Sequence, residues 1–317
     1  MKSKQLVVGL DGGGTKTEAI LVDPSGTLLS TKTGGPSNFQ ILGVEKAACV
    51  ILDLVQECAS GAGCEPKDIV GVVAGLTGAG RDSDKSRMLS ALRDEMKKRG
   101  LSFERVVVES DARIALEGAF RGNVGIILIG GTGSIAFGKG HDGTIFRVGG
   151  WGRILGDEGS GYAIGREGLN IVTKQLDGRI RSTLLTKLLA QSFKLETQEQ
   201  IITAVYKEQF DVASVAPLVI RAATEHDIEC ERILNKATFE LTEHVRAILL
   251  KIEGAARGRA RQKIPLAFIG GLLSSDTVLR KIVKHKITFS LPQISVVEPQ
   301  SSPARGAVLL GLALDAE

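Results

Sequence analysis

The sequence predicts an α/β protein made of two related halves, with extra helices in the second half. Three observations predict this fold class. Short apolar runs alternate with amphipathic segments through the first part of the chain. The order strand, glycine-rich bend, strand, turn, strand occurs near the N-terminus and again in the middle of the chain. Most of the chain that follows Trp151 has helical periodicity.

The first half begins with the apolar run Gln5–Leu10, which is typical of a buried strand and stops at the glycine-rich bend Asp11–Thr15. Strands are expected at Glu18–Asp23 and Thr27–Thr31, separated by the turn Pro24–Gly26. The bend is therefore expected to close a β-hairpin. The elements expected next, alternately helical and extended, are Gly43–Ala62, Ile69–Ala74, Asp84–Arg99, Arg105–Glu109 and Asp111–Phe120.

The second half repeats this order, with strands expected at Val124–Ile129, Ile135–Lys139 and Thr144–Val148 around the bend Gly130–Ser134. Two such copies imply two lobes that face each other, each offering one glycine-rich bend to a cleft. The helices expected after them are Gly161–Leu176, Thr183–Ser192, Thr197–Tyr206, Val212–Thr224, Ile228–Ala256 and Ala304–Leu314. The remaining strands are expected at Leu266–Ile269 and Ile294–Val297.

The composition is that of a globular protein with a real core, since 43% of the residues are hydrophobic and 24% are charged. The net charge of +4 comes from scattered residues, so it gives no support for a nucleic-acid partner. No apolar stretch approaches the roughly 20 residues that a membrane helix needs. The cysteines lack metal-ligand spacing and are expected to be free thiols. These features predict a cytoplasmic protein without a membrane partner. The cysteines are Cys49, Cys58, Cys64 and Cys230.

The first bend has the residue types that bind a phosphate. Gly12–Gly14 allow backbone N–H groups to approach an anion, and the hydroxyls of Thr15 and Thr17 add donors. Asp11 supplies a carboxylate of the kind that Mg²⁺ shares with water and phosphate. The bend does not match a P-loop, because Thr15 precedes Lys16 and no helix follows. It does not match a dinucleotide fingerprint either, because a hairpin follows in place of a βαβ unit.

The second bend, Gly130–Ser134, offers the same groups from the other half. Two convergent glycine loops fit a polyphosphate better than one does. The pair therefore favours nucleotide binding over two structural turns.

Two further segments carry carboxylates. Glycines surround Trp151 and Asp157 between Gly149 and Gly161, and this density predicts a tight loop in which Asp157 orients substrate or metal-bound water. Trp151 is expected in the core, as for most isolated tryptophans. Asp111 follows a strand and begins a helix, so it is interpreted either as an N-cap or as a base that accepts a hydroxyl proton.

The glycine motifs occur in an order that resembles a known family. The motifs are Asp11–Thr15, Gly131–Ser134, Gly149–Gly152 with Gly156–Ser160, and Gly270–Gly271. They resemble the N-acetylglucosamine kinase family, within the BadF/BadG/BcrA/BcrD ATPase group of the actin-like sugar-kinase superfamily, from about Gln5 to Gly311. The resemblance implies two ribonuclease-H-like lobes around a central cleft. Their expected extents are 1–120 with the C-terminal helix 304–317, and 121–303 with a helical insertion.

The same resemblance implies an activity, namely the ATP- and Mg²⁺-dependent phosphorylation of an amino sugar or hexose at its 6-hydroxyl. N-acetylglucosamine is the first expectation. Glucosamine, a muramic-type sugar and several hexoses are the alternatives. The resemblance is also compatible with a homodimer.

Individual residues receive roles from the resemblance. Asp111 matches the catalytic base, and Asp11 would hold Mg²⁺ through water. The positions implied for ATP are Gly12, Gly13, Gly14, Thr15, Lys16, Thr17, Gly131, Thr132, Gly133, Ala216, Gly270 and Gly271. The positions implied for the sugar are Asn38, Asp111, Ser134, Ile135, Gly149, Gly150, Trp151 and Asp157.

Two departures from the family pattern leave the sugar open. Ile135 stands where mammalian-type enzymes have asparagine, and Phe39 stands where they have histidine. Both changes are expected to make the pocket more apolar and less discriminating. A different class is an ATPase that activates a redox enzyme through an iron–sulfur cluster, but the four cysteines lie outside the glycine loops. A third interpretation is a sensor without activity, against which an intact Asp111 argues.

Overall fold

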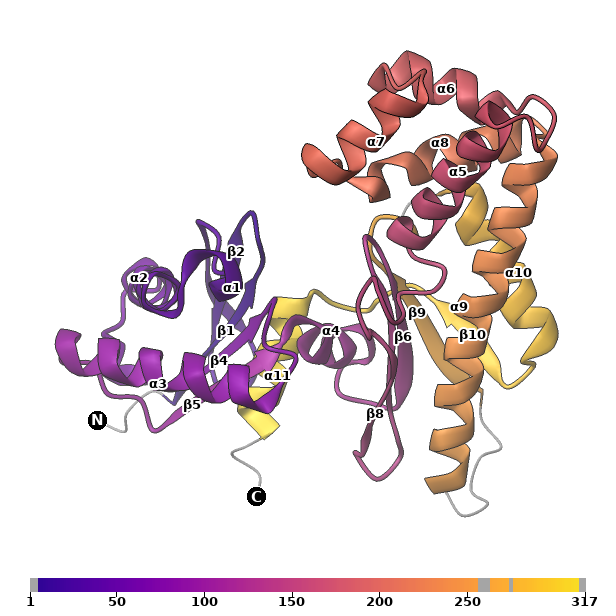
Figure 1. The fold of residues 1–317 in the computed structure, drawn as a ribbon. Coiled ribbons are helices and arrows are strands. Elements are labelled where there is room, and N and C mark those ends of the chain that lie inside the picture. Colours follow the sequence, from indigo (N-terminus) through magenta and orange to yellow (C-terminus); the bar gives the residue numbers. More distant parts are fainter. Residues whose placement is uncertain (1–4, 256–262, 274–275, 314–317) are drawn as a thin grey trace. The chain divides into compact units, whose positions relative to one another are not determined.

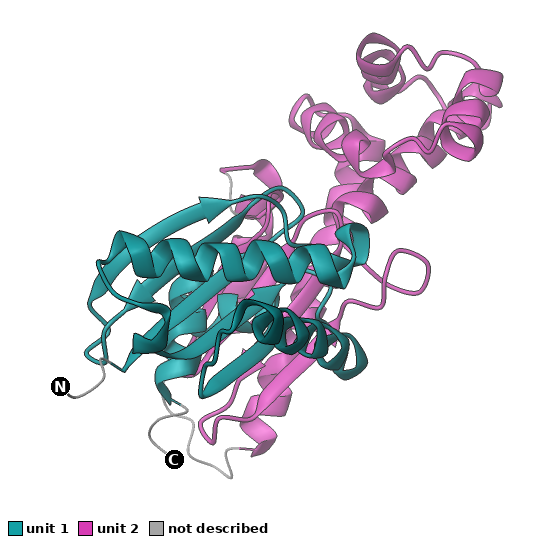
Figure 2. Cartoon of the chain, turned by 90° about the vertical axis from the view of Figure 1, so that its left-hand side faces the viewer, with its two compact units in different colours: residues 1–123, 298–317 teal, residues 124–297 magenta. Residues whose placement is uncertain are grey.

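The computed structural model describes residues 5–255, 263–273 and 276–313 (Figure 1). The chain divides into two compact units, coloured separately in Figure 2. Unit 1 comprises residues 1–123 and 298–317, and unit 2 comprises residues 124–297. The chain therefore leaves unit 1 after Asn123 and returns to it at Glu298. The sequence had placed these boundaries after residue 120 and before residue 304.

Unit 1 contains a five-stranded sheet in the order β3-β2-β1-β4-β5. The strands are β1 (Leu6–Gly12), β2 (Thr17–Val22), β3 (Leu28–Gly34), β4 (Ile69–Leu76) and β5 (Arg105–Ser110). The first three strands form antiparallel hairpins, whereas β4 and β5 run parallel to β1. The carboxyl ends of β1, β4 and β5 consequently meet at one edge of the sheet.

Helices cover both faces of this sheet. They are α1 (Phe39–Leu42), α2 (Val44–Gly61), α3 (Asp82–Arg99), α4 (Asp111–Phe120) and α11 (Pro303–Ala313), with a short 3₁₀ turn η1 at Pro66–Asp68. Leu6, Val8 and Leu10 of β1 join the core beneath α2 and α3. Val7 faces Ala304 and Val308 of α11 on the opposite side. Successive residues of β1 thus alternate between two buried faces, which explains why this strand is apolar throughout.

Unit 2 contains a second five-stranded sheet, in the order β10-β9-β6-β7-β8. Its strands are β6 (Gly125–Gly130), β7 (Ser134–Lys139), β8 (Ile145–Gly149), β9 (Ile264–Ile269) and β10 (Ile294–Val297). Two antiparallel hairpins come first again, and β9 and β10 are parallel to β6. Read from β6, the order of strands matches that of unit 1. The repeated unit and the α/β class predicted from the sequence are therefore confirmed.

The helices of unit 2 are α5 (Gly161–Leu176), α6 (Leu184–Phe193), α7 (Gln198–Lys207), α8 (Ala216–Thr224), α9 (Ile228–Ala255) and α10 (Val278–Ser290), with a 3₁₀ turn η2 at Val212–Val215. Helix α9 packs on β6, β7 and β8, while α10 packs on β10 and α9. Figure 1 shows α5 to α8 grouped at one end of the sheet. One core joins both parts, since it contains Leu128 of β6, Ile248 of α9 and Val219 of α8.

Two features differ from the expectations. Helix α10 was not predicted, although Leu279, Val283 and Ile287 are buried at helical spacing. The expected helix at 212–224 is divided into η2 and α8. The predicted helix ends Ala256 and Leu314 lie outside the described residues. No helix in the described parts of the chain is both long and apolar enough to cross a membrane.

Candidate functional site: two half-sites

The β1–β2 connection of unit 1 is a tight turn with an exposed tip. The Gly13 N–H donates to the Lys16 carbonyl at 3.0 Å, which closes the turn. Gly14, Thr15 and Lys16 are exposed, and a side chain placed at Gly14 would meet no atom within 4 Å. The backbone of the tip is therefore open to a ligand, as a phosphate loop requires.

Thr17 lies at the base of this turn and is fully buried. Its hydroxyl donates to the Gly35 carbonyl and contacts the Ser37 hydroxyl, both at 2.8 Å. The Gly13 carbonyl in turn accepts from the N–H groups of Ser37 and Asn38, each at 3.1 Å. The hydroxyl of Thr17 is thus engaged in holding the turn against residues 35–38.

Asp111 stands at the carboxyl end of β5, where α4 begins. Its Oδ2 accepts from the Thr77 hydroxyl at 2.7 Å, and its Oδ1 accepts from the Ala112 N–H at 2.8 Å. Ser110, and not Asp111, caps the helix, because its hydroxyl accepts from the Arg113 N–H at 3.1 Å. The N-cap interpretation of Asp111 is therefore wrong. Its carboxylate is half-buried and oriented by Thr77, which follows β4.

A second carboxylate, Asp11, lies near Asp111 at the same edge of the sheet. Burial, and then the negative charge of Asp111, raise the pKa of Asp11 to about 6. Glu18 raises it further, while Lys16 lowers it. Two acidic groups that repel each other in a half-buried setting form a place where a cation is stabilised. Among the described residues no group of three His, Cys, Asp or Glu side chains forms a metal cluster.

Asn38 caps the short helix α1, since its side-chain oxygen accepts from the Gln40 N–H at 3.1 Å. The Gln40 amide donates to the Gly78 carbonyl at 3.2 Å, so this turn is tied to the loop after β4. Phe39 differs from the expectation, because its ring is buried in the core of unit 1 with the Arg87 guanidinium 5.7 Å above it. Phe39 therefore does not present to a sugar the exposed apolar surface that was expected from the sequence.

The β6–β7 connection of unit 2 repeats the closed turn of unit 1. The Gly131 N–H donates to the Gly133 carbonyl at 3.0 Å. The Gly131 and Thr132 carbonyls accept from the Gly161 and Tyr162 N–H groups at 2.8 and 3.1 Å. These bonds fasten the turn to the N-terminus of α5, and the side chain of Thr132 remains exposed.

Ser134 is buried and joins this turn to the loop before α5. Its hydroxyl donates to the Glu158 carbonyl at 2.6 Å, and its N–H donates to the Asp157 carboxylate at 3.4 Å. Asp157 has a left-handed backbone with φ of 58°. A non-glycine residue in this conformation is uncommon and points to a constrained functional loop.

Gly149 ends β8 and Gly150 follows it, with φ of 76° and 69°. The Gly150 N–H donates to the Ser134 carbonyl at 3.0 Å, and the Arg147 guanidinium donates to the Gly150 carbonyl at 2.6 Å. Ile135 packs against Gly150, where a side chain would collide with it. Trp151 is 73% exposed, so its expected place in the core is wrong.

Gly270 and Gly271 follow β9 beside the root of the β6–β7 turn. Gly270 has φ of 90°, and the Leu272 N–H donates to the Gly130 carbonyl at 3.0 Å. Leu272 and Ala213 both lie 3.6 Å from the point where a side chain on Gly161 would begin. Ala216 is the first residue of α8 and is 1% exposed, one turn beyond Ala213.

The predicted residues therefore gather into two groups, one in each unit. The group in unit 1 is Asp11, Gly12, Gly13, Gly14, Thr15, Lys16, Thr17, Asn38 and Asp111. The group in unit 2 is Gly131, Thr132, Gly133, Ser134, Ile135, Gly149, Gly150, Trp151, Asp157, Ala216, Gly270 and Gly271.

Sequence reasoning missed the partners that orient these residues. Thr77 could have been found, because it follows a strand parallel to the one before Asp111 and must lie at the same edge. Ser37 adjoins Asn38 and was not singled out. His244 and Glu158 approach each other to 3.6 Å from opposite parts of unit 2. No sequence pattern connects α9 with the loop before α5.

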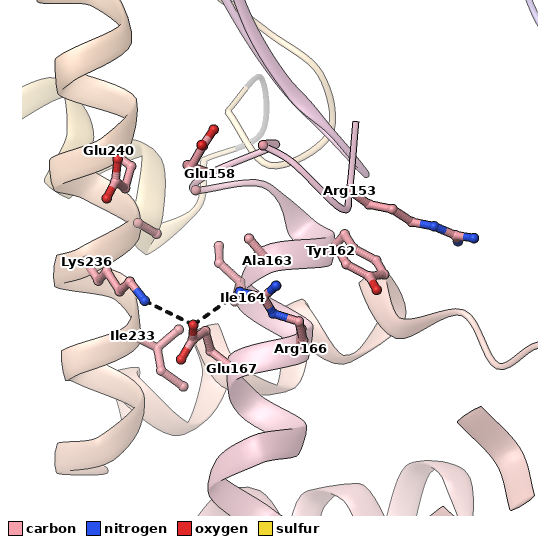
Figure 3. Close-up of a pocket in the computed structure, with 13 residues that line it drawn as sticks. Arg153, Glu158, Tyr162, Ala163, Ile164, Arg166, Glu167, Ile233, Lys236 and Glu240 are labelled. Atoms are coloured by element: carbon pink, nitrogen blue, oxygen red, sulfur yellow. Dashed lines mark hydrogen bonds and ion pairs between the residues drawn. The ribbon is translucent and has the colours of Figure 1, made fainter. Parts of the chain in front are cut away.

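A pocket of about 100 Å³ lies behind the loop before α5. Figure 3 shows it between α5 and α9, with Glu158 and Glu240 at one side. Glu167 at its floor accepts from Lys236 at 3.0 Å and contacts Arg166 at 3.5 Å. This pocket lies entirely within unit 2. Gly156, Glu158 and Gly159 of the glycine-rich motif line it, but none of the residues predicted to bind ATP or the sugar does.

Two units that each pair a 3-2-1-4-5 sheet with a glycine turn between the first two strands define a protein of the actin-like ATPase fold. The chain belongs to the BadF/BadG/BcrA/BcrD ATPase family, whose model matches residues 8–311. The N-acetylmuramic acid/N-acetylglucosamine kinase of Clostridium acetobutylicum is 30% identical over 307 residues, covering 96% of this chain and 97% of its own.

Two further relatives span the whole chain. The N-acetyl-D-glucosamine kinase of Dictyostelium discoideum is 29% identical and covers 98% of both chains. A solved structure from Chromobacterium violaceum, provisionally named an N-acetylglucosamine kinase, has a TM-score of 0.70. It is 27% identical and covers 98% of this chain and 99% of its own. The family resemblance read from the glycine motifs is therefore confirmed.

Proposed function

We propose that this protein is a sugar kinase that transfers the γ-phosphate of ATP to the 6-hydroxyl of an amino sugar. N-acetylglucosamine is the substrate that we expect first among the amino sugars. The observation that carries the proposal is the pair Asp11 and Asp111 beside the open glycine turn of unit 1. A kinase requires a phosphate loop, a carboxylate that accepts the hydroxyl proton and a place for Mg²⁺. The names of relatives over nearly the whole chain support the substrate class.

Asp111 is the proposed base. Its carboxylate accepts the proton of the sugar hydroxyl as that oxygen attacks the γ-phosphorus, and the bond from the γ-phosphorus to the β-phosphate oxygen breaks to release ADP. The Thr77 hydroxyl, 2.7 Å from Oδ2, keeps the carboxylate in one rotamer. The free Oδ2 lone pair then remains available to the hydroxyl.

Asp11 is the proposed Mg²⁺ residue, and it acts through water. Burial, and then the negative charge of Asp111, raise the pKa of Asp11, so a divalent cation bound there would stabilise its charged form. Mg²⁺ when bound supplies positive charge that offsets the charge on the phosphates. Few protein ligands are needed, because Mg²⁺ keeps several waters and uses phosphate oxygens.

We assign each of the other predicted residues either to ATP or to the sugar. For ATP, we assign the turns at Gly12–Lys16 and Gly131–Gly133 to the phosphates, and Ala216 with Gly270–Gly271 to the adenosine side. Thr17 supports the first turn from beneath. For the sugar, we assign Asn38, Ser134, Ile135, Gly149, Gly150, Trp151 and Asp157.

The assay that tests the activity measures ADP release with a panel of sugars. We expect turnover with N-acetylglucosamine, and we will compare N-acetylmuramic acid, glucosamine and glucose. The product should carry phosphate on the 6-oxygen by ³¹P–¹H correlation, and EDTA should stop the reaction. Failure of every amino sugar and hexose to stimulate ADP release would refute the proposal.

The redox-activator alternative has less support from the cysteines. Cys58 and Cys230 are buried, and burial raises the pKa of the Cys58 thiol to about 11. A thiolate is the form that binds iron, so such a thiol is a poor cluster ligand. Iron in anaerobically purified protein is the measurement that would favour this alternative.

A further inference from the structure

His244 lies on α9 and is the buried imidazole closest to the proposed sugar residues of unit 2. The residue is 8% exposed. The imidazole Nε2 lies 3.0 Å from the point where a side chain on Gly149 would begin, and 3.6 Å from Oε2 of Glu158. The ring therefore sits between the end of β8 and the loop before α5.

These two neighbours are joined to the sugar residues by short backbone links. Gly149 precedes Gly150, whose N–H donates to the Ser134 carbonyl at 3.0 Å. Glu158 follows Asp157, and its carbonyl accepts from the Ser134 hydroxyl at 2.6 Å. A shift of the imidazole would thus move Gly149 and Glu158, and through them the groups assigned to the sugar.

The protonation state of His244 determines which of its ring nitrogens can donate a hydrogen bond. Burial lowers the pKa of His244, although the nearby carboxylates of Glu158, Glu240 and Asp157 raise it. The ring is therefore neutral near pH 7. A neutral imidazole has one N–H. The Glu158 carboxylate faces Nε2, which places the proton on Nε2 and leaves Nδ1 as an acceptor. Nδ1 is buried, with no hydrogen-bond partner among the described residues.

A buried nitrogen without a partner is destabilising, and a core position at this point of α9 would be more stable with an apolar side chain. Packing alone therefore does not explain a histidine at this position. We propose that His244 is a positioning residue for the sugar: its Nε2–H directs the Glu158 side chain and its ring spaces Gly149 from the loop before α5. This inference rests on the proposed sugar-kinase function.

The test compares two replacements of nearly equal volume, His244→Gln and His244→Met. Glutamine can place an amide N–H near the position of Nε2, whereas methionine cannot donate. We expect His244→Met to raise the KM for N-acetylglucosamine about tenfold, because the N–H that faces the Glu158 carboxylate is lost. His244→Gln should stay within about threefold of the wild type, and the KM for ATP should change by less than about twofold in both.

Direct binding provides a second measurement that does not need turnover. Trp151 is the only tryptophan of the chain and is exposed next to Gly150, so its fluorescence reports sugar binding. We expect the Kd from this titration to rise in parallel with the KM for the sugar. Thermal unfolding of each variant separates a change in the site from a loss of fold.

A double-mutant cycle identifies the partner. Glu158→Met should weaken sugar binding in the same way, and His244→Met combined with Glu158→Met should weaken it no further than either alone. Glu240→Met is the matched control, because the Glu240 carboxylate also stabilises a charged imidazole but does not contact Nε2. The Kd of this variant for the sugar should stay within about twofold of the wild-type value.

The outcomes are distinct for the two proposals. Equal effects of glutamine and methionine, a rise of both KM values together, or an unchanged Kd in His244→Met would overturn the role of His244. A wild-type protein that neither turns over nor binds any sugar would instead overturn the proposed function. If His244→Met does not fold, Glu158→Met, whose side chain is partly exposed, decides the question through the same sugar titration.

Discussion

Asp11 and Asp111 stand at the ends of β1 and β5, on either side of β4. Asp111 is oriented by Thr77 and by the start of α4. Asp11 differs, because burial and then the charge of Asp111 raise its pKa to about 6. The two carboxylates thus have different environments, which fits different roles.

Replacing Asp111 with asparagine should lower kcat about 1,000-fold, because the amide cannot accept the hydroxyl proton. ATP binding should be unchanged, since the proposed phosphate turns remain intact. Turnover by ADP release and ATP affinity by calorimetry measure the two effects.

The matched control is Ser110→Ala, which removes the cap of α4 but keeps the carboxylate. It should reduce the stability of the protein by about 1 kcal/mol and leave most of the activity. Activity in Asp111→Asn that is close to the wild type would show that this carboxylate is not the base.

Replacing Asp11 with asparagine should stabilise the protein and inactivate it. Folding raises the pKa of Asp11 from 3.8 to about 6, so the folded chain binds more protons than the unfolded chain between these values. The contribution of Asp11 to stability therefore falls as the pH rises from about 4 to about 6. Above that range the charged side chain is destabilising, and its removal should raise the midpoint of thermal unfolding by about 2 °C at pH 7.5.

Thermal unfolding of the wild type and Asp11→Asn across pH 4–8 checks this sign, with Mg²⁺ absent. The difference between the two midpoints should grow with pH and then level off above about pH 6. A variant that is less stable than the wild type at pH 7.5 would contradict the raised pKa, and full Mg²⁺-dependent turnover would contradict the metal role.

Among the elements, α11 is the one that approaches its neighbours most closely. A side chain on Gly306 of α11 would collide with the Ile114 carbonyl of α4, and one on Gly9 of β1 would lie 2.6 Å from the Ala304 carbonyl. Glycines at both positions let the helix lie against the strand and α4. Ser301 continues this contact, since its hydroxyl donates to the Gly118 carbonyl at 2.8 Å.

Gly306→Ala should therefore destabilise the protein by about 3 kcal/mol, because the added methyl meets backbone that cannot move aside. Gly254→Ala on α9 is the matched control in another helix, where a side chain meets no atom within 4 Å. That change should stabilise the protein by up to about 1 kcal/mol. Urea unfolding of both variants measures the contrast, and equal effects of the two would contradict the close packing of α11.

At the scale of the whole molecule, unit 1 is completed by the end of the chain. Residues 298–317 return to it after unit 2 is finished, and α11 covers Val7, Ile20 and Val22 of its sheet. Unit 2 is continuous in sequence from 124 to 297. The two units therefore depend differently on the C-terminus.

A chain that ends at Val297 should lose the structure of unit 1 and keep that of unit 2. The apolar face of β1 and β2 would be exposed to water without α11, which removes a large part of the stabilising burial. Hydrogen exchange followed by mass spectrometry should show fast exchange in β1 and slow exchange in β6. Protection of β1 comparable with that of the full chain would contradict this dependence.

The sequence predicted much of this molecule because local patterns were strong. The apolar run of β1, the glycine bends and the periodicity of α9 each depend on neighbours within a few residues. The two hairpins of each half followed from repetition, which is visible along the sequence. Trp151 was placed wrongly because composition gives an average burial, whereas the loop around it turns the ring outward.

The contacts that orient the site residues join segments that are far apart in the sequence. Thr77 meets Asp111 across 34 positions, and His244 meets Glu158 across 86 positions. The first pair could have been inferred, because both residues follow parallel strands, whereas no sequence pattern connects the second pair. What the chain alone determined was the fold class, the two glycine turns and the residue types of a kinase, since each is a short-range pattern. Only the tertiary structure decided that Ser110 caps α4, that Thr17 is a support and that Asp11 has a raised pKa, because hydrogen-bond partners and burial arise from chain segments that meet on folding.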